Sequence, residues 1–361
     1  MAYSTGSGLY TDLMAAVLSH AIADGWTEAG GVGTGWPIVS PSGRIRGVDW
    51  DSTTSTESDF TLGGDGLPKT QRDGYLSVGS TPAEATSNAA TLSTGSGVRL
   101  RNFAYTIANW WIFSDISAGE YIHVVYNFSN GAASDVYSHF SFGEVDKGGL
   151  TYGSIAYATS PDKRGYAEST TGGTSSPKSN KGSDWNTLNR SGNMWAGDWG
   201  EVDEGWSSVA YMVNGTTAPV PNGVGGWPAW DSIIAQGERL WSGTARGSDT
   251  VFPSLDARRD GHFASSAWWL GLNAQTGVLP LMPIPFILIN GMGTSARNRW
   301  MGVYPDARFC TMNGVNPEDE ITFGSDTWKV FPVLRKTNWG ELNIRYRVTS
   351  GFAGYAYKKV V

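Results

Sequence analysis

Four acidic residues lie close together in the stretch GDWGEVDEGW, at Asp198, Glu201, Asp203 and Glu204. Carboxylate oxygens are the ligands that a hard cation such as Ca²⁺ prefers. The stretch lacks the D-x-D-x-D-G ladder that fixes ligand geometry in a calcium loop, however. We therefore keep these four residues as a candidate metal site, but expect a solvated acidic loop that binds no metal.

The histidines offer a second candidate. The chain has four, at His20, His123, His139 and His262. If the chain turns near Ala132, His123 and His139 become diagonal neighbours on one face of a hairpin, close enough to share a metal. No third ligand is evident beside them. We expect two polar side chains on the solvent-exposed face of a sheet.

The stretch PFILINGMGTSARN has the spacing of a dinucleotide-binding loop. Gly291, Gly293 and Ala296 follow an apolar run, and Asp319 comes a little over twenty residues later. Prolines crowd the apolar run, however, and Pro305 would end the following helix after about two turns. Too little chain remains for further βα units. We interpret the stretch as a loop between strands.

Two common catalytic motifs are absent from the sequence. It has neither a G-x-S-x-G elbow nor a G-x-x-x-x-G-K-[ST] loop. We therefore expect no enzymatic activity, no catalytic residue and no cofactor. A glycosidase pair of carboxylates remains open, because such a pair needs proximity in space and not in sequence. The Trp-rich stretches NMWAGDWGEVDEGWSSV and GGWPAWD would suit stacking on sugars or packing of long loops.

The composition favours turns and sheets over surface helices. Glycine accounts for 48 of 361 residues, about twice the usual share, and charged residues make up only 16%. The 17 Trp, 15 Tyr and 13 Phe supply the apolar area that offsets chain entropy. We expect a globular protein with many ordered loops.

Charge and hydropathy exclude several partners. The net charge of −7 argues against a surface that follows nucleic-acid phosphates. The apolar run at 278–289 is too short to span a bilayer and contains three prolines, and the N-terminus lacks the basic segment of a secretory signal. The single cysteine, Cys310, is expected to be a small buried apolar residue.

Periodicity predicts one helix and at least three hairpins. Apolar residues recur at helical spacing between residues 9 and 24, where Thr11 or Asp12 can cap the first turn and Gly25 ends the helix. Alternating stretches predict one hairpin over 119–145 and another over 320–337, with a turn at Gly324. Residues 51–100 are rich in Ser, Thr and Gly and are expected to form loops and short edge strands such as GYLSV.

Together these elements predict a mainly β fold with α+β character at the N-terminus. We expect an antiparallel, β-sandwich-like framework with a short N-terminal helix and long loops rich in Gly and Trp. The chain is divided into a helical docking segment at 1–50, a first β-rich part at 51–165, a loop-rich middle at 166–277 that is a possible insertion, and a β-rich segment at 278–361 that completes the framework.

Four stretches resemble segments of structural proteins from tailed-bacteriophage virions. They are YTDLMAAVLSHAIADGWTE at 10–28, HFSFGEVDKGGLTYGSIAYATS at 139–160, DARFCTMNGVNPEDEITFGSDTWKVFPVLRKTNWGE at 306–341 and SGFAGYAYKKV at 350–360. These stretches are folding signatures and not catalytic motifs. The resemblance implies a non-enzymatic component of the tail, baseplate or tail-fibre region.

The expected function is therefore that of a structural and assembly subunit of a virion, made in the bacterial cytoplasm. Its partners would be copies of itself and other virion proteins, with host surface glycan as a further candidate, and without nucleic acid or membrane insertion. The alternatives are a protein that binds or cleaves host glycans and a head decoration protein. The candidate structural or interface residues are Trp328, Phe331, Phe323, Tyr355 and Tyr357, and Trp328 is expected to lie in the core.

Overall fold

The computed structural model describes about half of the chain. The described residues are 3–30, 36–45, 47–54, 72–79, 81–83, 85–86, 97–100, 106–128, 137–149, 154–160, 206–213, 220–221, 232–234, 281–290, 297–312, 314–332 and 353–360. Its elements are β1 (Tyr3–Gly8), α1 (Tyr10–Ala23), β2 (Thr27–Glu28), β3 (Ile38–Val39), β4 (Gly47–Thr54), β5 (Arg72–Gly79), β6 (Gly97–Leu100), β7 (Ile107–Phe113), β8 (Tyr121–Phe128), β9 (Tyr137–Glu144), β10 (Ser154–Ser160), β11 (Trp206–Val213), β12 (Val220–Pro221), β13 (Ser232–Ile234), β14 (Met282–Asn290), β15 (Arg297–Thr311), β16 (Glu320–Phe323), β17 (Asp326–Pro332) and β18 (Ala353–Lys359).

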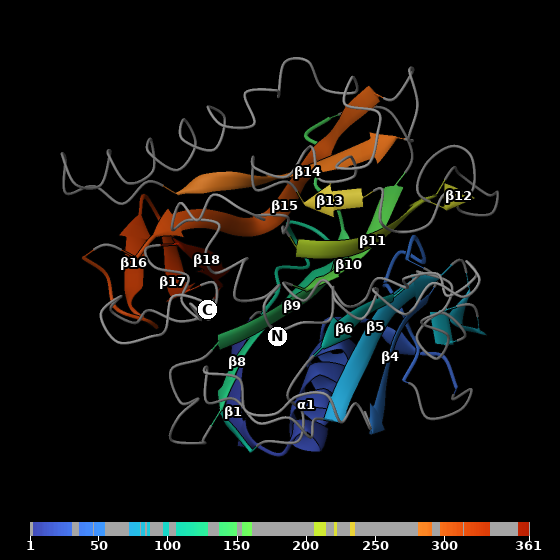
Figure 1. Ribbon diagram of the computed structural model, residues 1–361, viewed down its shortest axis with the longest axis horizontal. Helices are drawn as coiled ribbons and strands as arrows, with labels where there is room; N and C mark the ends of the chain where they lie inside the picture. The colour runs from blue at the N-terminus through green and yellow to red at the C-terminus, as the bar shows by residue number, and fades with distance from the viewer. Residues whose placement is uncertain are drawn as a thin grey trace, which may run out of the picture.

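The strands form two antiparallel sheets (Figure 1). The larger has thirteen strands in the order β1-β7-β8-β9-β10-β11-β13-β14-β15-β18-β17-β16, with β12 paired to β11. The smaller has five strands in the order β2-β3-β4-β5-β6. The predicted mainly β fold with an N-terminal helix is confirmed.

One face of the central strands β7–β10 packs against α1 and the smaller sheet. Because side chains alternate along a strand, Ile122, Val124 and Tyr126 of β8 point to this side. They share a core with Leu13 of α1 and Trp50 of β4. This core supplies the apolar contacts that hold the N-terminal helix and the smaller sheet in place.

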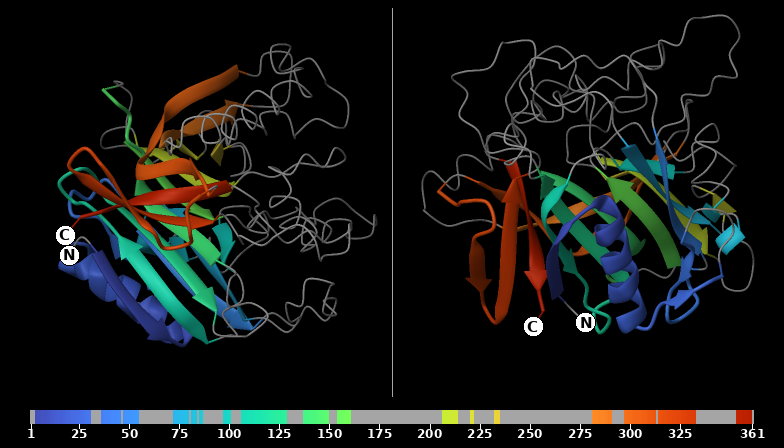
Figure 2. Two further views of the ribbon diagram at one scale, coloured as in Figure 1. Left: turned by 90° about the vertical axis from the view of Figure 1, so that its left-hand side faces the viewer. Right: turned by 90° about the horizontal axis from the view of Figure 1, so that it is seen from below.

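The opposite face of the central strands is covered by the C-terminal strands of the same sheet (Figure 2). The ring of Phe113 stacks on Tyr357 of β18 with centroids 5.4 Å apart, and Trp111 lies 4.9 Å from Phe331 of β17. The larger sheet therefore curls back on itself. As a result the central strands are buried on both faces.

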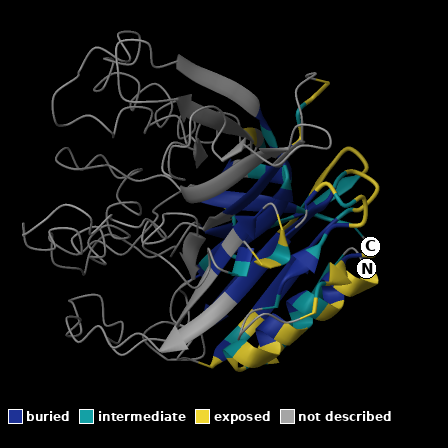
Figure 3. Cartoon of the chain, turned by 90° about the vertical axis from the view of Figure 1, so that its right-hand side faces the viewer, coloured by how far each residue is buried: buried dark blue, intermediate teal, exposed yellow. Residues whose placement is uncertain are grey.

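The predicted helix is confirmed as α1, and its ends follow local chemistry. Leu9 is the N-cap, and the carboxylate of Asp12 accepts a hydrogen bond from the Leu9 amide at 2.7 Å. Asp12 thus contributes from the third position of the helix, but the N-cap is Leu9, whose side chain makes no capping bond, so neither Thr11 nor Asp12 is the N-cap residue. Gly25 follows the C-cap with a φ of +86°, a conformation that favours glycine. The helix turns its buried side to the sheet and its exposed side outward (Figure 3).

The hairpin predicted over 320–337 is confirmed over 320–332 as β16 and β17, and residues 333–337 lie outside the described part. Phe323 pairs with Asp326 around a turn at Gly324, whose φ is +64°. Trp328 is only 5% exposed and packs with Cys310, Met312, Val330 and Ala356, whereas Phe323 at the tip is 66% exposed. The hairpin is thus anchored in the core at one end and reaches solvent at the other.

The expectation of loops and short edge strands over 51–100 is confirmed for β6, a short strand at the edge of the smaller sheet, but it is wrong for the GYLSV stretch. The GYLSV stretch lies in β5, which pairs with β4 on one side and β6 on the other. Leu76 and Val78 are fully buried in the core beneath α1. Tertiary packing overrides the composition here, because an alternating strand needs only a few apolar residues to bury one face.

The glycine-rich stretch after residue 290 connects two strands, as interpreted. Strands β14 and β15 are antiparallel, and Asn290 pairs with Arg297 across the connection. A dinucleotide-binding loop would instead lead from a strand into a helix. Residues 291–296 themselves lie outside the described part.

Truncation of Trp328 tests the strand assignment. We expect Trp328→Ala to lower the free energy of unfolding by about 3–5 kcal/mol, because a buried aromatic is lost and a cavity remains. Phe323→Ala on the same hairpin is the matched control and should change it by no more than about 0.5 kcal/mol. Urea unfolding measures both, and a Trp328→Ala variant as stable as the parent would mean that Trp328 lies on an exposed face of β17.

Candidate functional site

Three side chains of the types found in serine hydrolases meet at the end of α1. His20 Nε2 lies 2.8 Å from Ser114 Oγ, and Ser114 donates a hydrogen bond to Asp24. On the other side of the ring, His20 Nδ1 lies 3.0 Å from Ser4 Oγ of β1. The Asp24 carboxylate is also 3.6 Å from His20 Nε2.

The order of these contacts differs from that of a catalytic triad. A nucleophilic serine gives its proton to the histidine, and the aspartate binds the other ring nitrogen. Here Ser114 gives its proton to Asp24, so it accepts from His20 Nε2–H, and Ser4 donates to Nδ1. His20 and Ser114 are each 2% exposed. The network is therefore a structural link between α1, β1 and the segment after β7.

Burial makes this link sensitive to acid. Desolvation lowers the pKa of His20 to about 4, although the neighbouring Asp24 carboxylate acts in the opposite direction. Between pH 4 and 6.5 the unfolded chain, whose histidine has its ordinary pKa, binds more protons than the folded one. The folded state is thus not penalised by His20 above about pH 6.5, and the free energy of unfolding falls as the pH is lowered from there toward 4.

His20→Gln tests this dependence. From pH 7.5 to 4, the parent should lose up to about 3 kcal/mol more of its unfolding free energy than the variant does. Urea unfolding at several pH values provides the measurement. Parallel pH curves for parent and variant would show that His20 takes up no proton on unfolding.

His123 and His139 are diagonal neighbours, as predicted. His123 pairs with Ser141 and His139 pairs with Val125 across β8 and β9. Their expected place on a solvent-exposed face is wrong, because they are 0% and 1% exposed. Strands β15, β17 and β18, more than 150 residues later in the sequence, cover this face.

The ring nitrogens of both histidines are engaged in hydrogen bonds. His123 contacts the Pro305 carbonyl and Ser141 Oγ, each at 2.6 Å. His139 contacts the Pro332 carbonyl and Tyr357 Oη, each at 2.9 Å. The rings therefore fasten the C-terminal strands and do not present a free nitrogen to a metal. Among the described residues, no group of three or more potential metal ligands comes together.

Two tyrosines fasten the same strands at points of unusual backbone conformation. Asp306 and Glu318 have φ values of +45° and +71°, which few residues other than glycine adopt. The Asp306 carboxylate accepts from Tyr121 Oη at 2.6 Å, and the Glu318 carboxylate accepts from Tyr137 Oη at 2.9 Å. These bonds help to hold the strained backbone in place on the central sheet.

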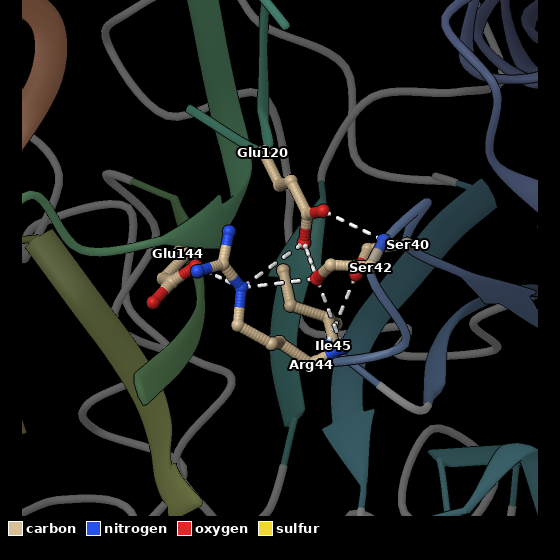
Figure 4. A network of polar contacts seen from close by, with 6 residues as sticks. All are labelled: Ser40, Ser42, Arg44, Ile45, Glu120 and Glu144. Carbon is tan, nitrogen blue, oxygen red and sulfur yellow. Dashed lines mark hydrogen bonds and ion pairs between the residues drawn. The ribbon is translucent and has the colours of Figure 1, made fainter. Parts of the chain in front are cut away.

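A fourth polar network joins the turn at 40–45 to the central sheet (Figure 4). The Glu120 carboxylate accepts from the Ser42 amide at 2.8 Å and from its hydroxyl at 2.7 Å. Arg44 Nε donates to Ser42 Oγ at 3.0 Å and lies 3.1 Å from Glu144 Oε2 and 3.9 Å from Glu120 Oε2. Glu120 is buried, whereas about half of the Arg44 side chain is exposed.

This network does not have the form of a glycosidase site. Two carboxylates do approach a common point, but the Arg44 guanidinium occupies it. An acid and a base that cleave a glycosidic bond need the substrate between them. Glu120 and Glu144 instead form an ion-pair network that anchors the turn, since a buried carboxylate needs such partners.

Substitution of the two glutamates distinguishes their roles. Glu120→Gln should lower the free energy of unfolding by about 1–3 kcal/mol, because charge-assisted bonds to Ser42 are weakened in a buried site. Glu144→Gln, the control, should cost less than about 1 kcal/mol, since its Arg44 partner is half exposed. Guanidinium unfolding measures both, and a larger effect at Glu144 would contradict this assignment.

The predicted structural and interface residues fall into two groups. Phe331, Tyr355 and Tyr357 are at most 1% exposed, and Trp328 is also buried. Of the two roles predicted for them, these four therefore fit the structural one, as framework residues, and Trp328 lies in the core as expected. Phe323 alone among the five is exposed.

Other predicted residues have different outcomes. Cys310 is buried as expected, and burial raises the pKa of its thiol. The acidic residues Asp198, Glu201, Asp203 and Glu204, and also His262, lie outside the described residues. The candidate metal site at 198–204 thus stays a prediction.

The Glu120 network could not be found in the sequence. Ser42 and Glu120 are 78 residues apart, and each is a common residue in an ordinary setting. The only local signal is the SPSGR stretch, which is typical of a turn. A turn signal in the sequence does not show which distant carboxylate will accept hydrogen bonds from the turn.

No protein-family model matches the chain, and no curated protein matches its sequence. In the described part of the chain, no helix has the length and apolar character needed to cross a membrane.

Proposed function

We propose that the protein is a non-enzymatic structural subunit of a bacteriophage virion, in its tail, baseplate or tail-fibre region. It would bind copies of itself and other virion proteins. The observation that carries the proposal is that the four stretches resembling virion proteins pack into one framework. They contribute α1, β9, β10, β16, β17, β18 and the end of β15.

Specific contacts join these four stretches. Trp26, just after α1, lies edge-on to Phe142 of β9 with ring centroids 5.6 Å apart. His139 of β9 is hydrogen bonded to Tyr357 of β18, and Tyr355 of β18 pairs with Phe331 of β17. The resemblance therefore concerns parts that fold together. Related structural proteins would have framework residues in common, whereas related enzymes would have the residues of an active site in common.

The β16–β17 hairpin offers a contact point for a neighbouring subunit. Phe323 is exposed at its tip, on the strand that ends the larger sheet. Aromatic side chains are enriched at the centres of protein interfaces, where they fill a pocket of the partner. The tip would serve as such an anchor, while the salt bridge from Lys359 to Glu320 at 2.9 Å stiffens its base.

The two alternatives remain predictions. A head decoration protein would have much the same framework and composition. A glycan-binding or glycan-cleaving protein would use the Trp-rich middle, most of which lies outside the described residues. The described Glu120–Arg44–Glu144 network does not favour this alternative.

Gold-labelled antibody on intact particles tests the proposal. Label confined to the tail tip, baseplate or fibres is the expected result. Label spread over the head would support the decoration alternative. Protein found in infected cells but not in purified particles would overturn the structural function altogether.

Phe323 is tested by incorporation into particles. We expect Phe323→Ser to reduce the copies per particle at least about tenfold, because an interface anchor is lost, while the melting temperature stays unchanged. Thr322→Ser, an exposed neighbour on the same strand, is the matched control. Quantitative mass spectrometry of purified particles gives the copy number, and normal incorporation of Phe323→Ser would exclude the hairpin tip as a contact.

A further inference from the structure

The interface between the central sheet and the C-terminal strands contains two uncharged, buried imidazoles. A carbonyl oxygen can only accept a hydrogen bond, so the ring nitrogens that face Pro305 and Pro332 must carry the protons. The remaining nitrogen of each neutral ring then accepts from a hydroxyl, Ser141 for His123 and Tyr357 for His139. Both imidazoles thus satisfy their partners in the neutral form.

A proton added to either ring would disturb these bonds. Nδ1 would become a donor, so the Ser141 or Tyr357 hydroxyl would have to turn away and donate elsewhere. For His123 the change would pass to Tyr157, whose hydroxyl lies 2.9 Å from Ser141 Oγ. Each added proton therefore forces a rearrangement inside the packed interface.

Within the described part of the chain, the groups around the pair are mainly tyrosines, with Arg308 as a cation. The Tyr357 ring lies 5.2 Å from the ring of His123 and 5.9 Å from that of His139, so both added charges would adjoin the same side chain. Arg308 opposes a charge on His123, and the nearby Asp306 carboxylate is bound to Tyr121. Among the described residues, the titratable and charged groups that face the pair are Tyr121 of β8, Tyr157 of β10, Tyr304, Asp306 and Arg308 of β15, and Tyr355 and Tyr357 of β18.

The other buried histidine has a different setting. His20 lies beneath α1 with the Asp24 carboxylate 3.6 Å from its ring, and this carboxylate favours the protonated form. The pKa of His20 is nevertheless lowered to about 4, as it is for His123 and His139. Among the described residues the α1 side thus has one such imidazole and the C-terminal side has two, so acid penalises the α1 contact less. The two faces of the central sheet should respond differently to pH.

We propose that His123 and His139 form a proton-operated latch, which releases strands β15, β17 and β18 from the central sheet in mild acid before the α1 side of the fold opens. The latch is closed when both rings are neutral and their nitrogens bind the C-terminal strands. It opens when protons bind the rings, because the charged forms are stable only in contact with water.

Proton linkage determines whether the open fraction rises or falls with pH, and how steeply. Burial lowers the pKa of each ring to about 4 in the closed state, whereas a ring exposed to water has its ordinary pKa near 6.5. As the pH falls from 6.5 to 4, the open state binds protons that the closed state does not. The open fraction should rise about tenfold per pH unit for each ring, and about a hundredfold for the pair.

Adjacent residues of β8 provide probes for the two faces. Val124 and Val125 are both fully buried, but Val124 belongs to the core beneath α1, while Val125 lies on the side of the histidines. Val125→Cys and Val124→Cys, each in a Cys310→Ala background, carry one thiol apiece. The probe is 4,4′-dithiodipyridine, which labels thiols in acid. The labelling rate of the unfolded protein in urea at the same pH corrects the rate of the folded protein for the intrinsic reactivity of the thiol.

Below pH 6.5 we expect the corrected labelling rate of Val125→Cys to rise about 10–100-fold per pH unit, and that of Val124→Cys to rise less. With His123→Gln and His139→Gln added, the rise at Val125→Cys should fall below about threefold per unit, while Val124→Cys keeps its own pH dependence. Glutamine can still donate to the proline carbonyls but takes up no proton.

Two results would overturn the latch. Parallel rises at Val124→Cys and Val125→Cys would mean that acid opens the whole fold, and a rise that persists in the double glutamine variant would place the proton elsewhere. If the glutamine variants do not fold, hydrogen exchange of the unmodified chain decides. Loss of protection in β17 and β18 at a higher pH than in α1 supports the latch, and simultaneous loss rejects it.

Discussion

Burial of both faces of the central strands is the constraint on which the rest of the structure depends. Every residue of β8 from Tyr121 to Asn127 is buried. A strand in this position cannot leave a polar group to the solvent, so each polar side chain must find a partner in a neighbouring layer. The hydrogen bonds of His123, His139 and Tyr121 meet this requirement, and they select the C-terminal strands as the covering layer.

The two faces of the central sheet carry different kinds of side chain. The side beneath α1 is aliphatic and aromatic, with Ile122 and Val124 in contact with the helix and the smaller sheet. The side beneath β15, β17 and β18 combines aromatic rings with hydroxyls and imidazoles. Apolar packing tolerates small shifts, whereas hydrogen bonds at fixed distances set one register. The mixed side therefore determines how the curled sheet closes on itself.

Such a framework suits the proposed part in a particle. A subunit held by neighbours needs a stable body and a few exposed anchor points, and the β16–β17 hairpin combines a buried Trp328 with an exposed Phe323. A proton-operated latch would add to this body a way to separate one layer without unfolding the other. The latch and the anchor are independent of each other, because the latch lies inside the framework and the anchor lies at its edge.

Local periodicity determined much of the fold. The sequence alone predicts α1 and its end at Gly25, the β8–β9 and β16–β17 hairpins, the loop between β14 and β15, and the diagonal placement of His123 and His139. Each of these depends on residues within about 30 positions of one another. Turn chemistry and side-chain alternation act at that range.

Only the tertiary structure decided what covers each face. The polar His123 and His139 predict one solvent-exposed face, because polar side chains normally mark the wet side of a sheet. The C-terminal groups that bury these two histidines come from residues 304–357, and no local pattern indicates such a pairing. Likewise the Glu120–Ser42 bond joins common residue types across 78 positions. Contacts of this kind depend on how a long chain closes, and that is settled by the packing of the whole core and not by the neighbours of any one residue.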